Sequence, residues 1–174
     1  MACGSFLGAG RSGPDSGWPC ILWRRSLARE SQLWGWLSGA RQVLRQDLHI
    51  QRIENGLEDG TPDVEYIIRG VMSGGVWIEL KSAKRPARGT TCVSFRLRPA
   101  QGDWMQDRFE AGDKRSGWLL QVGSGGNRAV YYLTGKHRSA LYAGVTEKEL
   151  EALSALSSPH LKPHDILIEI AFIS

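Results

Sequence analysis

Asp63, Glu79 and Lys81 have the residue types and spacing of a site that could hydrolyse phosphodiesters. Asp63 directly follows Pro62, and Glu79 and Lys81 are separated by a single residue. Two carboxylates that converge can bind a hard cation such as Mg²⁺, which prefers oxygen ligands and shares its coordination with substrate phosphates. A lysine beside two carboxylates tends to stay protonated, so Lys81 would position the attacking water or stabilise charge on a phosphorus-bound oxygen.

A β-hairpin is the element that would bring these three side chains together. Residues 64–69 and 76–82 have the apolar pattern of strands, and the turn-forming tetrapeptide MSGG lies between them. A period of two sends alternate side chains to opposite faces of the second strand: Val76, Ile78 and Leu80 to one, and Trp77, Glu79 and Lys81 to the other. The alternative is an exposed polar stripe in which Glu79 and Lys81 form a surface ion pair of little energetic value.

The Pro-Asp pair alone is weak evidence, because the chain contains a second one at Pro14 and Asp15. That second pair has no strand pattern around it and no Glu-x-Lys at hairpin distance. The context of the hairpin therefore selects Asp63 as the candidate ligand.

The rest of the chain alternates between helical and strand patterns. Apolar residues at helical spacing predict a helix over residues 26–46, and a second helix opens at Pro99 and ends before Gly112. Thr146 and Glu149 form a capping box in front of a third helix, which bears Leu150, Leu153 and Leu156. Strand patterns cover residues 48–56, 117–123, 129–133 and the apolar tail 165–173. This order predicts an α/β fold in which a mixed sheet is flanked by helices.

Length and composition fit one globular domain. A chain of 174 residues with 41% hydrophobic residues can build one substantial core. We expect residues 1–25, which are rich in Gly and Ser, to be a flexible leader and residues 26–174 to be a single domain.

Three function classes are disfavoured by composition. The three cysteines are widely spaced and form no CxxC pair, which argues against a disulfide framework and a zinc site. No apolar run approaches the roughly 20 residues that a membrane-spanning helix needs. The N-terminus also lacks a secretory pattern, so we expect a cytoplasmic protein without a membrane partner.

A run of cations follows the second strand of the hairpin. Lys and Arg outnumber Asp and Glu by 22 to 18, which mildly favours a polyanionic partner. Between residues 84 and 98 there is no acid and there are five cations: Lys84, Arg85, Arg88, Arg96 and Arg98. A basic run is often only a solvated surface. Placed directly after the candidate site, these residues would bind backbone phosphates without reading the bases.

Taken together, these motifs resemble the PD-(D/E)XK nuclease core, and the residues around them resemble its VRR-NUC branch, in particular phage-type members. The motifs that carry the resemblance are GTPDV (60–64), WIELKSAKRP (77–86), LWGWL (33–37), RIEN (52–55) and LRPAQGDWM (97–105). The resemblance covers about residues 30–155. It implies a restriction-endonuclease-like sandwich with a central mixed sheet flanked by helices.

The resemblance implies a role for each matching residue of the hairpin. Asp63 and Glu79 would ligate Mg²⁺ or Mn²⁺, and the backbone carbonyl of Leu80 would add a ligand. Lys81 would be the catalytic lysine.

Two further positions complete the implied site. Gln101, at the start of the following helix, would support the active site or touch the scissile phosphate, although glutamine is also common in a first helical turn without a function. Related nucleases use an acid on the leading helix as well. The candidates are Glu30, which we favour as a metal ligand, and Glu54; an acid early in a helix is also explained by the helix dipole alone.

By the same resemblance, the chain would be a Mg²⁺-dependent endodeoxyribonuclease in a bacterial or phage-infected cell, leaving 5′-phosphate ends. The branch includes junction-resolving and flap-processing enzymes, so branched DNA is one implied substrate, and small members often act as homodimers. Two other classes stay open. One is a non-catalytic nucleic-acid-binding module that retains the nuclease fold, and the other is a hydrolase of small phosphoesters, which the basic run disfavours.

Overall fold

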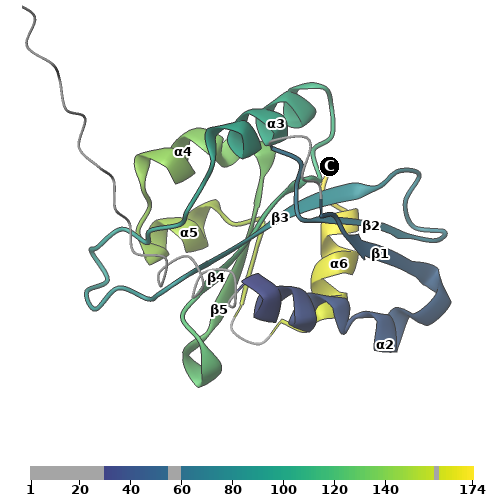
Figure 1. Ribbon diagram of the computed structural model, residues 1–174, viewed down its shortest axis with the longest axis horizontal. Helices are drawn as coiled ribbons and strands as arrows, with labels where there is room; N and C mark the ends of the chain where they lie inside the picture. The colour runs from purple at the N-terminus through teal and green to yellow at the C-terminus, as the bar shows by residue number, and fades with distance from the viewer. Residues whose placement is uncertain (1–29, 55–59, 159–160) are drawn as a thin grey trace, which may run out of the picture.

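A six-stranded mixed sheet forms the centre of the molecule. The computed structural model describes residues 30–54, 60–158 and 161–174, so the predicted leader lies outside the described residues (Figure 1). The strands follow one another across the sheet in chain order. They are β1 (Leu48–Arg52), β2 (Val64–Ile68), β3 (Val76–Ala83), β4 (Gly117–Val122), β5 (Ala129–Thr134) and β6 (Leu156–Ser158). β3 and β4 run parallel, and the other neighbouring strands of the sheet pair antiparallel. The predicted α/β class with a mixed sheet is confirmed.

Helices cover both faces of this sheet. A helix over residues 30–38, α2 (Arg41–Leu44) and α6 (Pro163–Ala171) belong to one side. The other side carries α3 (Pro99–Glu110), α4 (Arg138–Ala143) and α5 (Glu147–Leu153). Figure 1 shows α3, α4 and α5 together on one side of the strands and α6 and α2 on the other. α3 connects the two parallel strands, as such a pair requires a crossover.

Each face of the sheet has its own apolar core. Ile78 and Leu80 of β3 lie in the core under the helix over residues 30–38 and α6. Trp118 and Leu120 of β4 lie in the core under α3, α4 and α5. Every residue of β4 and β5 is buried, because both faces of these inner strands are covered. The polar side chains of β3 therefore have to lie between the sheet and α3.

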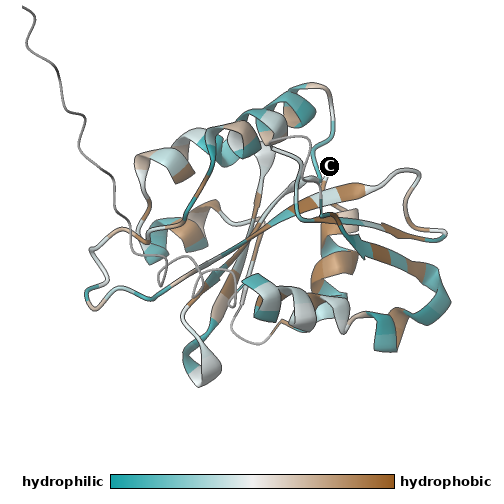
Figure 2. Cartoon of the chain, in the orientation of Figure 1, coloured by the Kyte–Doolittle hydropathy of each residue, from teal (hydrophilic) through white to brown (hydrophobic). Residues whose placement is uncertain are grey.

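The strand predicted for residues 165–173 is wrong, because this segment is helix α6. Pro163 stands in its first turn, where the missing N–H costs nothing. Ile166, Leu167 and Ile170 follow at helical spacing and are buried against the sheet. Figure 2 shows α6 as a strongly apolar helix. The β-branched residues favour a strand locally, but packing of this apolar stripe on the sheet decides the structure.

Most other element predictions agree with the structure, and two helix boundaries differ. Residues 26–29 of the helix predicted over 26–46 lie outside the described residues; the rest is helical over 30–38, turns at residues 39–40 and resumes as α2. The predicted third helix begins with the Thr146 and Glu149 capping box but ends at Leu153, and Leu156 lies in β6 instead. Within the described part of the chain, no helix has the length and apolar character to cross a bilayer.

Candidate active site

Asp63 lies beside the middle of β3, immediately before the first residue of β2. Val64 pairs with Ile78, so continuing the antiparallel register by one residue places Asp63 opposite Glu79. The backbone N–H of Leu80 donates a hydrogen bond to Oδ2 of Asp63 at 2.9 Å. The backbone carbonyl of Asp63 accepts a hydrogen bond from the N–H of Ile53 at 2.8 Å, which ties the segment after β1 to this position. Asp63 is therefore held by β1 and β3 at the point where β2 begins.

Glu79 and Lys81 are buried side by side under α3. Glu79 is 0% exposed and Lys81 is 6% exposed. The ammonium of Lys81 lies 2.5 Å from Oε1 of Glu79. The two residues alternate with Leu80, which enters the opposite core, as the strand period predicts. The exposed polar stripe that the sequence also allowed is thus excluded. A buried charged pair is costly unless it is well satisfied, and such pairs are often kept for function.

Gln101 connects helix α3 to this pair. Its side-chain Nε2 donates a hydrogen bond to Oε1 of Glu79, and its Oε1 accepts one from the backbone N–H of Arg98 at 3.3 Å. Gln101 is 1% exposed. The Gln101 side chain therefore both caps the start of α3 and holds the Glu79 carboxylate.

Burial and neighbouring charges oppose each other at Glu79 and Lys81. Burial raises the pKa of Glu79 to about 8, the charge of Lys81 works against this, and the charges of Asp63 and Glu30 add to it. Burial works to lower the pKa of Lys81, but the charges of Glu79, Glu30 and Asp63 outweigh it and raise that pKa. Lys81 therefore keeps its proton. The Glu79 carboxylate is ionised only to the extent that nearby positive charge offsets its burial.

The geometry at Glu79 fits a divalent cation. Oε1 of Glu79 accepts hydrogen bonds from Lys81 and Gln101, whereas Oε2 is buried and has no hydrogen-bond partner. A buried oxygen without a partner is costly, and a cation at Oε2 would satisfy it. In an extended strand the N–H and the carbonyl of one residue point to the same side. The carbonyl of Leu80 therefore points to the side from which Asp63 approaches, as its predicted role as a ligand requires.

A third carboxylate near the pair is Glu30, the first described residue of the helix that includes residues 30–38. Its charge acts on both Glu79 and Lys81. Glu54 is exposed, and it is not among the charges that dominate either pKa. Across residues 30–54, 60–158 and 161–174, no three His, Cys, Asp or Glu side chains gather into a metal-binding group. Asp63 and Glu79 are therefore the two candidate carboxylate ligands, and Glu30 is a neighbouring charge.

The five cations predicted to bind DNA divide into two groups. Lys84, Arg88, Arg96 and Arg98 are exposed on the segment between β3 and α3. Arg85 instead holds the protein together: its Nε lies 2.8 Å from Oε2 of Glu147 and its Nη2 lies 2.5 Å from Oε1. Its Nη1 also donates a hydrogen bond to Oδ1 of Asn127. The hydroxyl of Tyr131 donates to Oε1 of Glu147 at 2.8 Å. Arg85 thus joins the β3 end, the β4–β5 turn and α5.

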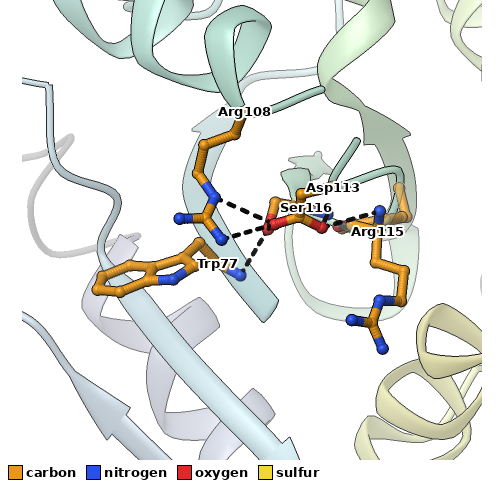
Figure 3. A network of polar contacts seen from close by, with 6 residues as sticks. Trp77, Arg108, Asp113, Arg115 and Ser116 are labelled. Atoms are coloured by element: carbon orange, nitrogen blue, oxygen red, sulfur yellow. Dashed lines mark hydrogen bonds and ion pairs between the residues drawn. The ribbon is translucent and has the colours of Figure 1, made fainter. Parts of the chain in front are cut away.

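Sequence reasoning missed a polar network at the beginning of β3 (Figure 3). The backbone N–H of Trp77 donates to the Ser116 hydroxyl at 2.9 Å, and that hydroxyl donates to Oδ2 of Asp113 at 2.6 Å. Arg108 of α3 forms an ion pair with the same carboxylate at 3.0 Å. Backbone N–H groups of Arg115 and Ser116 donate to Oδ1 of Asp113. An aspartate three residues before a serine is a turn signal that could have indicated this site.

The network and an aromatic contact fix the first half of β3 against α3. The ring of Trp77 packs against that of Trp104, with centroids 5.5 Å apart, and the Arg108 guanidinium lies 5.1 Å from the Trp104 centroid. Trp77 therefore packs beside the candidate site. These contacts anchor the strand two residues before Glu79.

These features define the class of the protein as an α/β protein with a six-stranded mixed sheet packed against several helices and a buried carboxylate-lysine pair under one of them. No protein-family model matches the chain, and no curated protein matches it. A functional assignment therefore depends on the residues and the geometry described above.

Proposed function

We propose that this protein is a divalent-metal-dependent nuclease of the PD-(D/E)XK class, similar to the VRR-NUC branch, which hydrolyses phosphodiester bonds in DNA. The observation that carries the proposal is the arrangement around Glu79. Its buried carboxylate is held on one oxygen by Lys81 and Gln101 and has no partner on the other, and Asp63 lies beside the same strand. A structural ion pair alone would not require an aspartate, a glutamine and an unsatisfied oxygen at one point.

Each residue of the site has a task in this proposal. Asp63, Glu79 and the Leu80 carbonyl would hold the cation. When bound, Mg²⁺ or Mn²⁺ would supply Lewis-acid activation of water and neutralise charge on the phosphate. Lys81, whose pKa is raised, keeps its proton and would direct an N–H toward a phosphate oxygen or the attacking water. Gln101 keeps the Glu79 carboxylate in one orientation, so that its free oxygen faces the cation position.

Exposed cations next to the site support a polynucleotide as the substrate. Lys84 lies three residues beyond Lys81, which corresponds to about 10 Å along an extended strand. Lys84, Arg88, Arg96 and Arg98 are exposed along the segment that leaves β3. Such a surface would attract backbone phosphates with little base preference, and affinity would fall as salt is raised. A branched DNA substrate and a homodimer, which would let two sites act on two strands, are further parts of the proposal.

The experiment that tests the proposal is cleavage of supercoiled plasmid and of a synthetic four-way junction in Mg²⁺ or Mn²⁺. Wild type is compared with Glu79→Ala, Lys81→Ala and the exposed control Glu169→Ala. We expect wild type and the control to cut and the two site variants to lose at least about 100-fold in rate, the scale of a lost electrostatic catalytic group. Binding without cutting by wild type would instead indicate the non-catalytic DNA-binding module. Equal cutting by all four proteins would place the activity elsewhere.

A further inference from the structure

A polar hollow lies at the carboxyl ends of the two parallel strands, β3 and β4. It has a volume of about 390 Å³ and is lined by Lys84 and Arg85 from the end of β3 and by Gly123, Ser124 and Asn127 from the turn after β4. No acidic side chain is among the residues that line this hollow. Its chemistry is therefore that of an anion site.

Arg85 holds the residues that line the hollow in place and is not the main group that would contact a bound anion. Both carboxylate oxygens of Glu147 accept hydrogen bonds from the Arg85 guanidinium, and Oδ1 of Asn127 accepts another. The Asn127 amide is thereby turned so that its carbonyl oxygen faces Arg85. Its Nδ2 group, which carries two donors, is the part left to meet a ligand. The β4–β5 turn is thus fixed relative to the segment after β3.

The donors of the hollow match a phosphate group. The Lys84 ammonium, the Asn127 amide and the Ser124 hydroxyl belong to exposed residues that line it. Charged and neutral donors of this kind are the usual partners of phosphate oxygens in nucleic-acid complexes. Lys84 is about 10 Å along the strand from Lys81, so a phosphate bound at Lys84 would not be the scissile one.

We propose that this hollow is a second phosphate subsite, in which Lys84, Asn127 and Ser124 bind a backbone phosphate of the DNA strand away from the bond that is cut. Arg85 acts as a positioning residue through Asn127 and Glu147. The inference rests on the proposed nuclease function and deepens it, because a two-phosphate site selects polynucleotides over small phosphodiesters. It also adds Asn127 and Ser124 to the DNA-binding residues.

The test uses Asn127→Asp, because aspartate keeps an oxygen acceptor for Arg85 but replaces the amide donors by negative charge. Gln42→Glu, on the exposed surface of α2, adds the same charge away from the hollow and is the matched control. Binding of a fluorescent DNA junction is measured with Ca²⁺ in place of Mg²⁺, and cleavage of the junction and of bis(p-nitrophenyl) phosphate is measured with Mg²⁺. We expect Asn127→Asp to weaken junction binding and raise the KM for the junction about tenfold, as for a lost charge-assisted contact, and Gln42→Glu to leave binding, KM and hydrolysis of the small diester unchanged.

The outcomes separate the subsite from the nuclease function. Unchanged junction binding and KM in Asn127→Asp would overturn the subsite even if wild type cuts DNA. If wild type cuts neither substrate, the nuclease proposal fails, and the Ca²⁺ binding data still decide whether the hollow binds DNA. A series of DNA strands, each with one phosphate replaced by an uncharged methylphosphonate, gives a measurement that a purely structural role of Asn127 would not change. Replacement at the phosphate that binds the hollow should lower the DNA affinity of wild type about tenfold and should lower that of Asn127→Asp only slightly.

Discussion

The buried ammonium of Lys81 donates a hydrogen bond to Oε1 of Glu79 at 2.5 Å, and Oε2 of the same carboxylate has no hydrogen-bond partner. Both residues belong to β3, and Gln101 of α3 donates a second hydrogen bond to Oε1 of Glu79. A buried carboxylate oxygen without a partner is costly, and the cation of the proposed site would supply that partner.

Gln101→Met should lower kcat for DNA cleavage by about tenfold to 100-fold, the range for residues that orient a metal ligand. Methionine has similar length and keeps α3 helical but leaves Glu79 without the hydrogen bond from Nε2. Single-turnover cleavage rates give the measurement. Gln106→Met on the same helix removes a side chain that donates to the exposed Glu110, and its rates should match wild type. An unchanged kcat in Gln101→Met would reduce Gln101 to a helix cap.

Asp113→Asn should destabilise the protein by about 1–3 kcal/mol at neutral pH, because it weakens the bonds to Arg108 and Ser116. Despite its partial burial, those hydrogen bonds and the Arg108 charge lower the pKa of Asp113 below the ordinary aspartate value of 3.8. A lowered folded-state pKa gives stability that is present above pH 3.8 and is lost as the pH falls through the folded pKa. Denaturant unfolding of wild type and Asp113→Asn is measured from pH 7 downward. The difference between their free energies of unfolding should become smaller in this acidic range. A difference independent of pH would contradict the ionic role of Asp113.

Charge reversal on the segment after β3 should reduce the salt dependence of DNA binding. Lys84→Glu and Arg96→Glu each remove an exposed cation, and each lost phosphate contact should lower the slope of log Kd against log salt by about 1. Anisotropy titrations at several salt concentrations provide the slopes. Lys148→Glu on α5 makes the same charge change at an exposed position and should keep the wild-type slope. Equal slopes in all three variants would mean that only total charge matters.

The face of β3 that holds the site could be predicted from sequence because strand periodicity is local. Glu79 and Lys81 alternate with Leu80, and the structure separates them accordingly. The exact partner of Asp63 could not be predicted, since the register depends on the hairpin turn, and the structure supplies the bond to the Leu80 N–H. The capping role of Gln101 was one of the alternatives from sequence, whereas its contact with Glu79 depends on how α3 packs.

Features that depend on residues far apart in the chain could not be predicted from the sequence. In the sequence, Arg85 is one of several cations in a basic run. Its hydrogen-bond partners Glu147 and Asn127 are 62 and 42 residues away in the chain, so the local sequence does not indicate them. The tail at 165–173 reads as a strand because of its β-branched residues, and only its packing on the sheet makes it helical. The alternation of apolar and polar residues thus predicted the strand that carries the candidate site. Which of the nearby cations are bound to other residues and which are exposed depends on tertiary contacts.

The most direct test of the account is a Mn²⁺ titration followed by electron paramagnetic resonance, with no DNA present. Wild type, Glu79→Gln and the exposed control Glu169→Gln are compared at the same pH. The account predicts saturable Mn²⁺ binding by wild type and by Glu169→Gln, and binding at least about tenfold weaker in Glu79→Gln, because a ligand oxygen is lost. Binding by Glu79→Gln equal to wild type, or no binding by wild type, would contradict the assignment of Glu79 as a metal ligand.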